Sequence, residues 1–502
     1  MTNFIKYNIR AMALAASILC LVSCLEKYPE EAIPEEKALT TVDEANQFVL
    51  GIYADFKSSA LYSGLLTLLP DIQADLVYAV DGYSNTYGDI WRWEILPTSN
   101  EITSVWAALY GVIGDCNFFF DYEPALRASL TSDEEVEQLN ELCGETHFAR
   151  ALAYSELIKC FCKAYEPETA GDELGVILVD SYHNPGKFTR SSLKESYQFV
   201  LDDLAKAEEL VTFGDTYSSV YFTKSLVHAL YARTYLYMQD WDKAIEHSTE
   251  VIEDDALSLS SASRIYSSAG VSFYDYMWTN DVATEIIWKV GFTTTSYGGA
   301  LGQVFLNYNY AYYRPDYVPA SWALNLYTEK DLRYNSFFTS TTTGYAHGLT
   351  WPLLTKYMGN KEFLSSGILH VSMPKVFRLS EQYLIRAEAR CRRGEFGIAA
   401  KDITTLRTAR YSDYSSTSIS ADNWLQTISD ERVRELYMEG FRLQDLKRWH
   451  KGFERKAADK PAANFVQSSL KVEKDDPLFV WPIPQHELEA PGSEIQPNES
   501  NK

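Results

Sequence analysis

The sequence predicts a mainly α-helical protein whose helical hairpins support a second, loop-rich half with a few short strands. Three observations favour this fold class. Apolar residues recur at three- and four-residue spacing over several long segments, which is the period of one face of a helix. Two of these segments repeat one another at a fixed distance along the chain. Two other segments are rich in glycine, proline and aromatic residues and lack a helical period.

The first helices are expected in a definite order. Thr41-Val42-Asp43-Glu44 opens a helix over about 41–57, and its apolar side chains share one face. Apolar stripes of the same kind predict three further helices, at about 101–120, 134–165 and 191–211.

An internal repeat lies downstream. Residues 229–254 and 384–409 align at an offset of 155, and each reads as helix, short turn, helix. Ala232 and Ala387 would let the two helices of each hairpin approach closely, and the aromatic residues after the turn, Trp241 and Phe396, are expected to be buried. This pattern resembles a tetratricopeptide unit, which needs stacked neighbours to bury its faces. We therefore expect tetratricopeptide-like hairpins over about 41–57, 101–254 and 378–450.

The loop-rich half is expected at about 60–100 and 255–377. Both stretches hold many tyrosines and tryptophans among glycine, proline and aspartate. Long loops inside a compact domain are usually functional or disordered, and aromatic-rich loops are poor candidates for disorder. Ligand-binding loops are therefore expected here, with one short strand at 286–290.

The amino terminus reads as a secretory signal peptide over 1–23. Two basic residues precede an apolar stretch of twelve residues, which is too short to span a membrane as a helix. The run Leu21-Val22-Ser23-Cys24 resembles a lipobox, the processing site of bacterial lipoproteins. That resemblance implies cleavage before Cys24 and acylation of its thiol, followed by an acidic tether over 24–40. The alternative is an ordinary cysteine behind a normal cleavage site.

Charge and cysteine content argue against two classes of protein, those that bind nucleic acid and those built on disulfides. The chain carries a net charge of −24, which argues against binding nucleic acid, since that function needs basic patches. The cysteines beyond Cys24 are sparse and odd in number, which indicates small buried side chains and not a disulfide scaffold. They are Cys116, Cys143, Cys160, Cys162 and Cys391.

No sequence pattern indicates an enzyme, a cofactor or a metal site. The eight histidines are scattered without metal-binding spacing, and neither a nucleophile elbow nor a phosphate-binding loop occurs. A glycosidase pair stays open, but 69 acidic residues make a chance pair of carboxylates expected. Charged residues from Glu431 to Arg448 alternate in sign along what is expected to be one helix, and we expect them to pair about one turn apart on a solvated or interhelical face.

Three segments of the carboxy-terminal third occur in a distinctive order. They are EQYLIRAEARCRRGEFGIAAKD at 381–402, ISDERVRELYMEGFRLQDLKRW at 428–449 and WPIPQHEL at 481–488. Behind a lipobox, they resemble the RagB/SusD family of outer-membrane nutrient-binding lipoproteins. Segments 104–120 and 144–165 are similar to early helices of that family, although the usual Asn-Pro-Gly-Tyr ending is missing.

The resemblance implies a single SusD-like domain over 41–502, lipid-anchored at the cell outer membrane and surface-exposed. It also implies a partner, a TonB-dependent β-barrel transporter of the SusC type. The protein itself would lie over the mouth of this barrel as a hinged lid, capture oligosaccharides and pass them to the transporter. Two alternatives stay open: the same architecture could bind peptides, or a tetratricopeptide adaptor could bind a protein partner.

The aromatic loops form the predicted ligand site. A sugar ring presents an apolar face that can stack on aromatic rings, while its hydroxyls need polar partners. Tyr308, Tyr310 and Tyr312 would share one face if extended, and one of Trp91 and Trp93 is expected to be exposed. Rings of the first loop are expected to approach rings of the second. The predicted ligand contacts are Tyr83, Tyr87, Trp91, Tyr297, Tyr310, Tyr312 and Tyr313.

Overall fold

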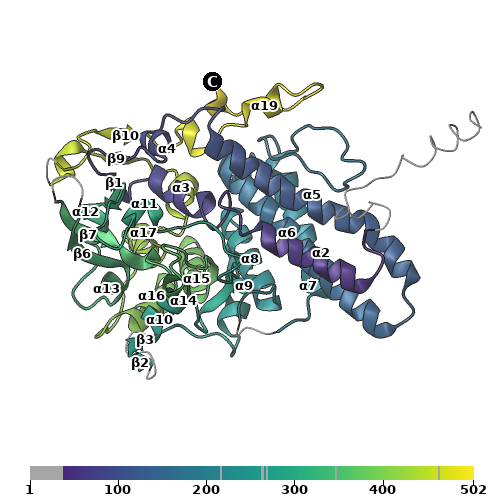
Figure 1. Cartoon of the computed structure of the whole chain (residues 1–502), viewed down its shortest axis with the longest axis horizontal. Coiled ribbons are helices and arrows are strands. Elements are labelled where there is room, and N and C mark those ends of the chain that lie inside the picture. Colours follow the sequence, from purple (N-terminus) through teal and green to yellow (C-terminus); the bar gives the residue numbers. More distant parts are fainter. Residues whose placement is uncertain (1–37, 215–217, 262–264, 267–269, 345–347, 462–463) are drawn as a thin grey trace, which may run out of the picture.

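The computed structural model describes residues 38–502 except 215–217, 262–264, 267–269, 345–347 and 462–463. The predicted signal peptide over 1–23, the lipidation residue Cys24 and all but the end of the tether over 24–40 lie outside the described residues. Helices dominate the described chain, and its strands form two-stranded antiparallel sheets (Figure 1). The predicted fold class is therefore confirmed.

Four long helices lie side by side at one end of the molecule (Figure 1). They are α2 (Val42–Asp55), α5 (Asn100–Ser129), α6 (Asp133–Phe161) and α7 (Leu193–Leu210). Helix α2 starts with a capping box, in which the Thr41 hydroxyl accepts the Glu44 N–H and the Glu44 carboxylate accepts the Thr41 N–H. All four occur where the apolar stripes predict helices, although α5 continues well past residue 120.

Two helical hairpins follow and pack on one another. They are α8 (Lys224–Tyr237) with α9 (Trp241–Ile252), and α15 (Leu379–Arg392) with α16 (Phe396–Arg410). Helix α15 packs against α9, and Ala232 and Ala387 are fully buried, as the repeat predicts. Trp241 and Phe396 are only half-buried, so their predicted burial is wrong. Each is the first residue of its helix and packs against an apolar cluster without being enclosed by it.

The charged segment that ends the helical region forms two helices and not one. They are α17 (Trp424–Glu435) and α18 (Arg442–Arg448), separated by a turn in which Met438 and Gly440 have positive φ. Most of its charged side chains are buried, and their partners come largely from distant segments. Two of the expected pairs one turn apart do form, Glu431 with Arg434 and Asp445 with Arg448. The expected single helix with a solvated face is wrong, because most of these groups are buried and also bind several other elements.

The loop-rich half contains the short strands. Strand β4 (Ile286–Lys289) occurs where the sequence predicts it and pairs with β8 (Lys375–Arg378). The other pairs are β1 (Val77–Ala79) with β5 (Tyr317–Pro319), β2 (Ile265–Tyr266) with β3 (Val271–Ser272), β6 (Phe338–Thr342) with β7 (Thr350–Leu354), and β9 (Phe453–Arg455) with β10 (Leu470–Val472).

Short helices connect these strands. Helix α3 (Leu65–Gln73) falls in a stretch expected to be loop, and every one of its residues is buried. The helix is short, contains Pro70, and buries its polar Asp71 and Gln73 as well, so the sequence pattern did not reveal it. The remaining short helices are α4 (Gly88–Arg92), α10 (Phe273–Asn280), α11 (Gln303–Leu306), α12 (Ser321–Leu324), α13 (Arg333–Phe337), α14 (Lys361–Ser365) and α19 (Gln485–Leu488).

The five cysteines beyond Cys24 are all free and buried, as predicted. Burial raises the pKa of the Cys143, Cys160 and Cys391 thiols to about 12, so they are inert apolar side chains. Among the described residues, no helix combines the length and apolarity that crossing a membrane requires.

Candidate ligand-binding site

The first aromatic loop follows strand β1 and is tied to the segment that enters strand β5. The Asp316 carboxylate accepts the Ser84 N–H at 2.7 Å and the Ser84 hydroxyl at 2.6 Å. The Tyr317 hydroxyl donates to the Thr86 carbonyl at 2.7 Å. Since β1 and β5 pair directly, these bonds fix the first aromatic loop beside the carboxy-terminal end of the second aromatic loop, just before β5.

Arg92 organises the polar edge of the first loop. Its Nη1 donates to the Tyr83 hydroxyl at 2.8 Å and to Asn85 Oδ1 at 2.7 Å. Its Nε donates to Glu94 at 2.7 Å. Gly88 is needed beneath this cluster, because a Cβ there would lie 2.0 Å from Asn85 Oδ1. Tyr83 is thus half-buried, and its hydroxyl already has hydrogen-bond partners within the protein.

The other aromatic residues of the first loop face inward. Tyr87 is half-buried against both main apolar clusters. Trp91 is 2% exposed beneath the Arg455 guanidinium, and Trp93 is 8% exposed with its indole N–H on the Gln73 carbonyl. The expectation that one tryptophan is exposed is therefore wrong, because this segment is the short helix α4 and not an extended strand. Trp91 has no ring face open to a ligand.

The second aromatic segment, residues 307–314, is a compact turn that we call the tyrosine loop. Asn307 leaves helix α11 with a φ of 38°, and the Arg314 N–H donates back to the Leu306 carbonyl at 2.9 Å. Within the turn, Asn309 Oδ1 accepts the N–H groups of Ala311 and Tyr312 at 3.1 and 3.0 Å. The chain is therefore not extended here.

This turn separates the tyrosines into two sets. Tyr308 stacks on Tyr313 with ring centroids 4.6 Å apart, and Tyr310 lies 5.9 Å from Tyr308. Tyr312 packs over Gly344, where a Cβ would lie 2.4 Å from its ring. The expected single face of Tyr308, Tyr310 and Tyr312 does not form, because Asn309 turns the backbone between them.

Exposure marks which predicted rings can meet a ligand. Tyr310 is 65% exposed, Tyr297 46% and Tyr312 40%. The Tyr297 ring lies 6.2 Å from the Phe363 ring. These three rings offer apolar surface to solvent, as a stacking platform requires.

The seven predicted residues come together only in part. Among the described residues, no ring contact joins Tyr83 or Tyr87 to the exposed tyrosines of the second segment. The two loops meet instead through Asp316 and Tyr317, whose ring lies 5.7 Å from Tyr83. The sequence reasoning did not single out Asp316, whose place at the entry to β5, directly after the tyrosine loop, was the available signal.

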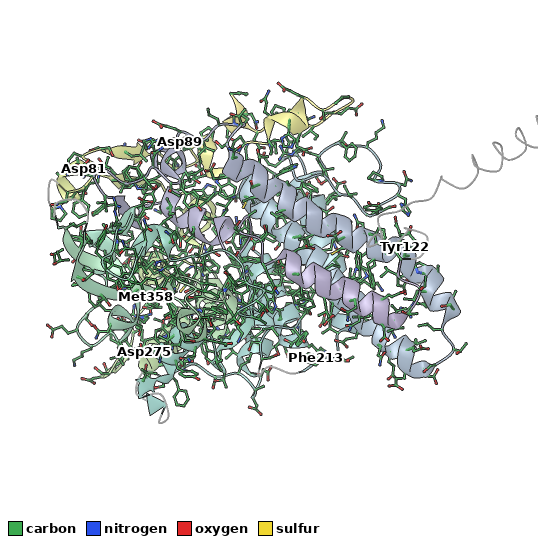
Figure 2. All side chains as sticks on the ribbon, in the orientation of Figure 1. Asp81, Asp89, Tyr122, Phe213, Asp275 and Met358 are labelled. Carbon is green, nitrogen blue, oxygen red and sulfur yellow. The ribbon has the colours of Figure 1, made fainter. Side chains whose placement is uncertain are left out.

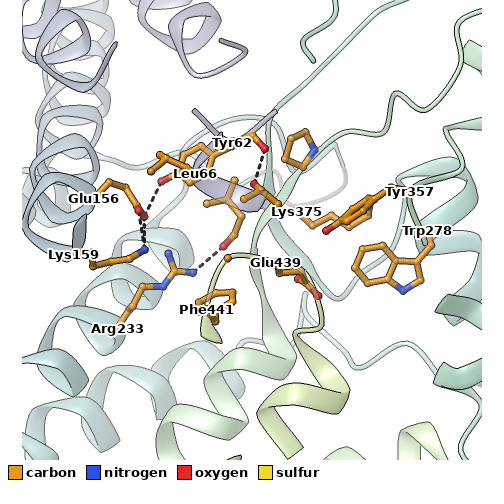
Figure 3. Close-up of a pocket in the computed structure, with 14 residues that line it drawn as sticks. Tyr62, Leu66, Glu156, Lys159, Arg233, Trp278, Tyr357, Lys375, Glu439 and Phe441 are labelled. Carbon is orange, nitrogen blue, oxygen red and sulfur yellow. Dashed lines mark hydrogen bonds and ion pairs between the residues drawn. The ribbon is translucent and has the colours of Figure 1, made fainter. Parts of the chain in front are cut away.

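A cavity lies deep between the helical and loop-rich parts (Figure 3). Glu156, Lys159 and Arg233 come from helices α6 and α8 on one side, and Lys375 and Glu439 come from the other side. Its volume is about 30 Å³, which is room for one or two water molecules and not for an oligomeric ligand. Within the described ranges, no group of three or more His, Cys, Asp or Glu side chains could hold a metal ion.

Two family models match the chain. One describes the SusD family and matches residues 189–498, which is more than half of the chain. The chain belongs to the SusD family. A second model, described as starch-binding and associating with the outer membrane, matches residues 27–236 of this SusD-family protein. No curated protein sequence matches it.

Solved structures show the same fold. A SusD superfamily protein from Bacteroides thetaiotaomicron is 24% identical, with a TM-score of 0.77 over 91% of this chain and 99% of the other. One from Bacteroides vulgatus is 23% identical, with a TM-score of 0.76 over 91% and 99%. Surface glycan-binding protein A from Bacteroides fluxus is 18% identical, with a TM-score of 0.67 over 92% and 99%. At these identities the likeness concerns the fold alone.

Proposed function

We propose that this SusD-family protein is a non-catalytic lipoprotein of the outer membrane that captures oligosaccharides and delivers them to a SusC-like TonB-dependent transporter. The observation that carries the proposal is the set of exposed tyrosines on the loop-rich part of a SusD-family fold. Tyr310, Tyr312 and Tyr297 each keep 40% or more of their surface exposed to solvent.

The chemistry of the site suits a sugar chain. Stacking uses the apolar face of a sugar ring, and amide or carboxylate groups can bind its hydroxyls. Asn307, Asp89 and Asn85 supply such groups around the two loops. An open surface without a deep pocket also suits capture of a long chain followed by release.

The comparisons support the cargo and the location. The model that matches residues 27–236 is described as starch-binding and associating with the outer membrane. The Bacteroides fluxus protein of the same fold is named a surface glycan-binding protein. The proposal includes acylation of Cys24, an acidic tether over 24–40 and one folded domain over 41–502.

Calorimetry with a panel of glycans and a panel of peptides tests the cargo. A glycan that binds the wild type should bind Tyr310→Ala and Tyr312→Ala about tenfold more weakly, since an aromatic stack contributes about 1–3 kcal/mol. Tyr182→Ala is the matched control, because Tyr182 is 49% exposed on the helical part. Thermal melts of all three variants should match the wild type.

The outcomes separate the alternatives. Binding of peptides but not glycans would give the same architecture a peptide cargo. Binding of neither, with stable capture of a folded protein partner, would favour an adaptor. Glycan binding that is unchanged in both tyrosine variants would place the site elsewhere on the molecule.

A further inference from the structure

A second cleft lies on the helical part, away from the tyrosine loop. Its volume is about 510 Å³, and helices α2 and α6 and the segment between α7 and α8 line it. Figure 2 shows Phe213 of this cleft at a different edge of the molecule from Asp81 and Asp89 of the first aromatic loop. None of the residues that line it is among the ligand contacts proposed above.

The rim of the cleft is aromatic and fixed by the fold. Phe213 and Tyr221 are 37% and 40% exposed, and their rings meet edge to face at 5.5 Å. The Glu141 carboxylate accepts the Thr212 N–H at 2.8 Å and the Phe213 N–H at 3.1 Å. Two exposed rings are thus held by the fold at the mouth of the cleft, where they can contact a ligand.

Glu145 is the buried polar group of the cleft, with only 8% of its surface exposed. The Tyr53 hydroxyl accepts the Phe222 N–H at 2.8 Å, so its own proton points to Glu145 Oε1 at 2.9 Å. Among the described residues, no hydrogen bond reaches Oε2 of Glu145. This oxygen is therefore the one available to a ligand.

The charges around Glu145 are all negative. Asp43 of α2 and Glu141 of α6 also line the cleft, Phe213 and Tyr221 come from the chain between α7 and α8, and among the residues that the structure describes no lysine, arginine or histidine lines it. Burial raises the pKa of the Glu145 carboxyl to about 7; the bond from Tyr53 opposes this shift and the Glu141 charge adds to it. A buried acid without a basic partner, facing a cleft, is a candidate binding group.

We propose that this cleft binds a ligand carrying a protonated amine, whose ammonium donates to Glu145 Oε2 while its carbon frame packs on Phe213 and Tyr221. An ammonium is a donor without acceptors, so it matches a site that offers carboxyl oxygens and lacks positive charge. Aromatic rings attract cations, whereas an anion would meet three carboxyl groups. The amine can belong to an amino sugar or to a lysine side chain.

Calorimetry with two matched ligand pairs tests the proposal, at pH 8 for the peptide pair and at pH 7 for the sugar pair, because the weakly basic amines of chitosan lose most of their protons by pH 8. One pair is a chitosan tetramer and its fully N-acetylated form, and the other is an N-acetylated glycyl-lysyl-glycine peptide and the same N-acetylated peptide with norleucine in place of lysine. In at least one pair, the amine member should bind at least tenfold more tightly than its uncharged partner. The pair that shows this preference identifies the source of the amine.

Two variants connect the preference to Glu145. Glu145→Gln keeps an oxygen that can accept the Tyr53 hydroxyl but removes the charge. The affinities of the two members of a pair should then differ by no more than about twofold. Glu137→Gln is the matched control, an exposed acid on the same helix outside the cleft, and should leave the preference unchanged. Phe213→Ala should weaken the binding of both members of the pair, because both carbon frames lose a ring on which they pack.

The pH dependence gives a second readout. The lysine amine stays charged between pH 6 and pH 8, whereas Glu145, with a pKa of about 7, ionises across this range. Affinity for a bound amine ligand of the lysine type should rise about tenfold from pH 6 to pH 8, and Glu145→Gln should abolish the rise. Equal binding within both pairs, including no binding, would overturn the proposal, as would an amine preference that survives Glu145→Gln.

Discussion

Glu435 shows how much charge the core of this protein holds. Its carboxylate is fully buried and pairs with Arg333 at 3.0 Å, Arg378 at 2.7 Å and Arg410 at 2.9 Å. Burial alone would raise the pKa of Glu435, but the three guanidiniums lower it well below its usual range. A charge this deep persists only because its partners compensate it.

Removing this charge should be costly. Glu435→Gln leaves three buried guanidiniums with less compensation, so the free energy of unfolding should fall by about 3–5 kcal/mol in urea denaturation. Glu137→Gln, an exposed acid on α6, should change it by less than about 0.5 kcal/mol. A loss below about 1 kcal/mol for Glu435→Gln would contradict the idea that this cluster stabilises the fold.

The hairpin of α8 and α9 contains an element sensitive to acid. Nδ1 of His228 and Nδ1 of His247 lie 3.0 Å apart, so one must donate and the other accept. His247 also stacks on Tyr231 at 4.4 Å. The charged groups that influence the pair are Glu208 of α7, Lys224 of α8, and Asp240, Lys243, Glu246 and Glu250 in and before α9.

The hairpin should therefore weaken as the pH falls. Burial lowers the pKa of both imidazoles, and the neighbouring His228 helps to bring that of His247 to about 4. Since the folded pKa lies below the unfolded value, this contribution is complete above about pH 6.5 and is lost as the pH falls towards 4. Between pH 7 and pH 4.5, the melting temperature should fall less steeply for His247→Phe than for the wild type. The exposed His486→Phe is the control, and identical slopes for all three proteins would disprove this role.

Close packing within the second hairpin is open to a steric test. Ala387 of α15 is fully buried, so Ala387→Trp forces the neighbouring helices apart. The free energy of unfolding should fall by at least about 1–3 kcal/mol in urea denaturation. Ala54→Trp on the exposed side of α2 should have little effect. A fully stable Ala387→Trp protein would show that the hairpin tolerates a wider separation.

At the scale of the whole molecule, the described part of the chain begins only a short distance in sequence after the proposed anchor, Cys24. The first described residues lead into α2, and Leu39 is already buried in the apolar cluster around that helix. The folded body thus begins within about fifteen residues of Cys24, which would hold it near the membrane surface.

Metabolic labelling tests the anchor. Wild-type protein should incorporate a radiolabelled fatty acid and sediment with membranes, because several acyl chains at one residue give stable attachment. Cys24→Ala should incorporate no label and remain in the supernatant, while Cys391→Ala is the control for a cysteine in the folded body. Labelled Cys24→Ala protein would rule out acylation at this position.

The helical part could be predicted from sequence because its signal is local. Apolar period and repeated small residues such as Ala232 and Ala387 locate the helices without any knowledge of their partners. Helix α3 escaped because it is buried all round. The arrangement of the predicted site could not be predicted because it depends on a turn: the Asn309 side chain accepts the backbone N–H groups of Ala311 and Tyr312, so the segment is not extended. Long-range partners such as Asp316 with Ser84 leave no periodic trace.

The same buried ion cluster limits how the protein can move. Arg333 of α13 and Arg378 at the start of α15 both reach Glu435 of α17, and Glu285 beside β4 binds Arg378 and Arg410. Bending one half against the other would strip counter-charges from several guanidiniums at once, so internal hinging is strongly disfavoured. If the proposed transporter complex forms, the folded body would move over it as one rigid unit, bending at its attachment and not within itself. Amide hydrogens of α15, α17 and β8 should accordingly exchange together, in one slow opening event.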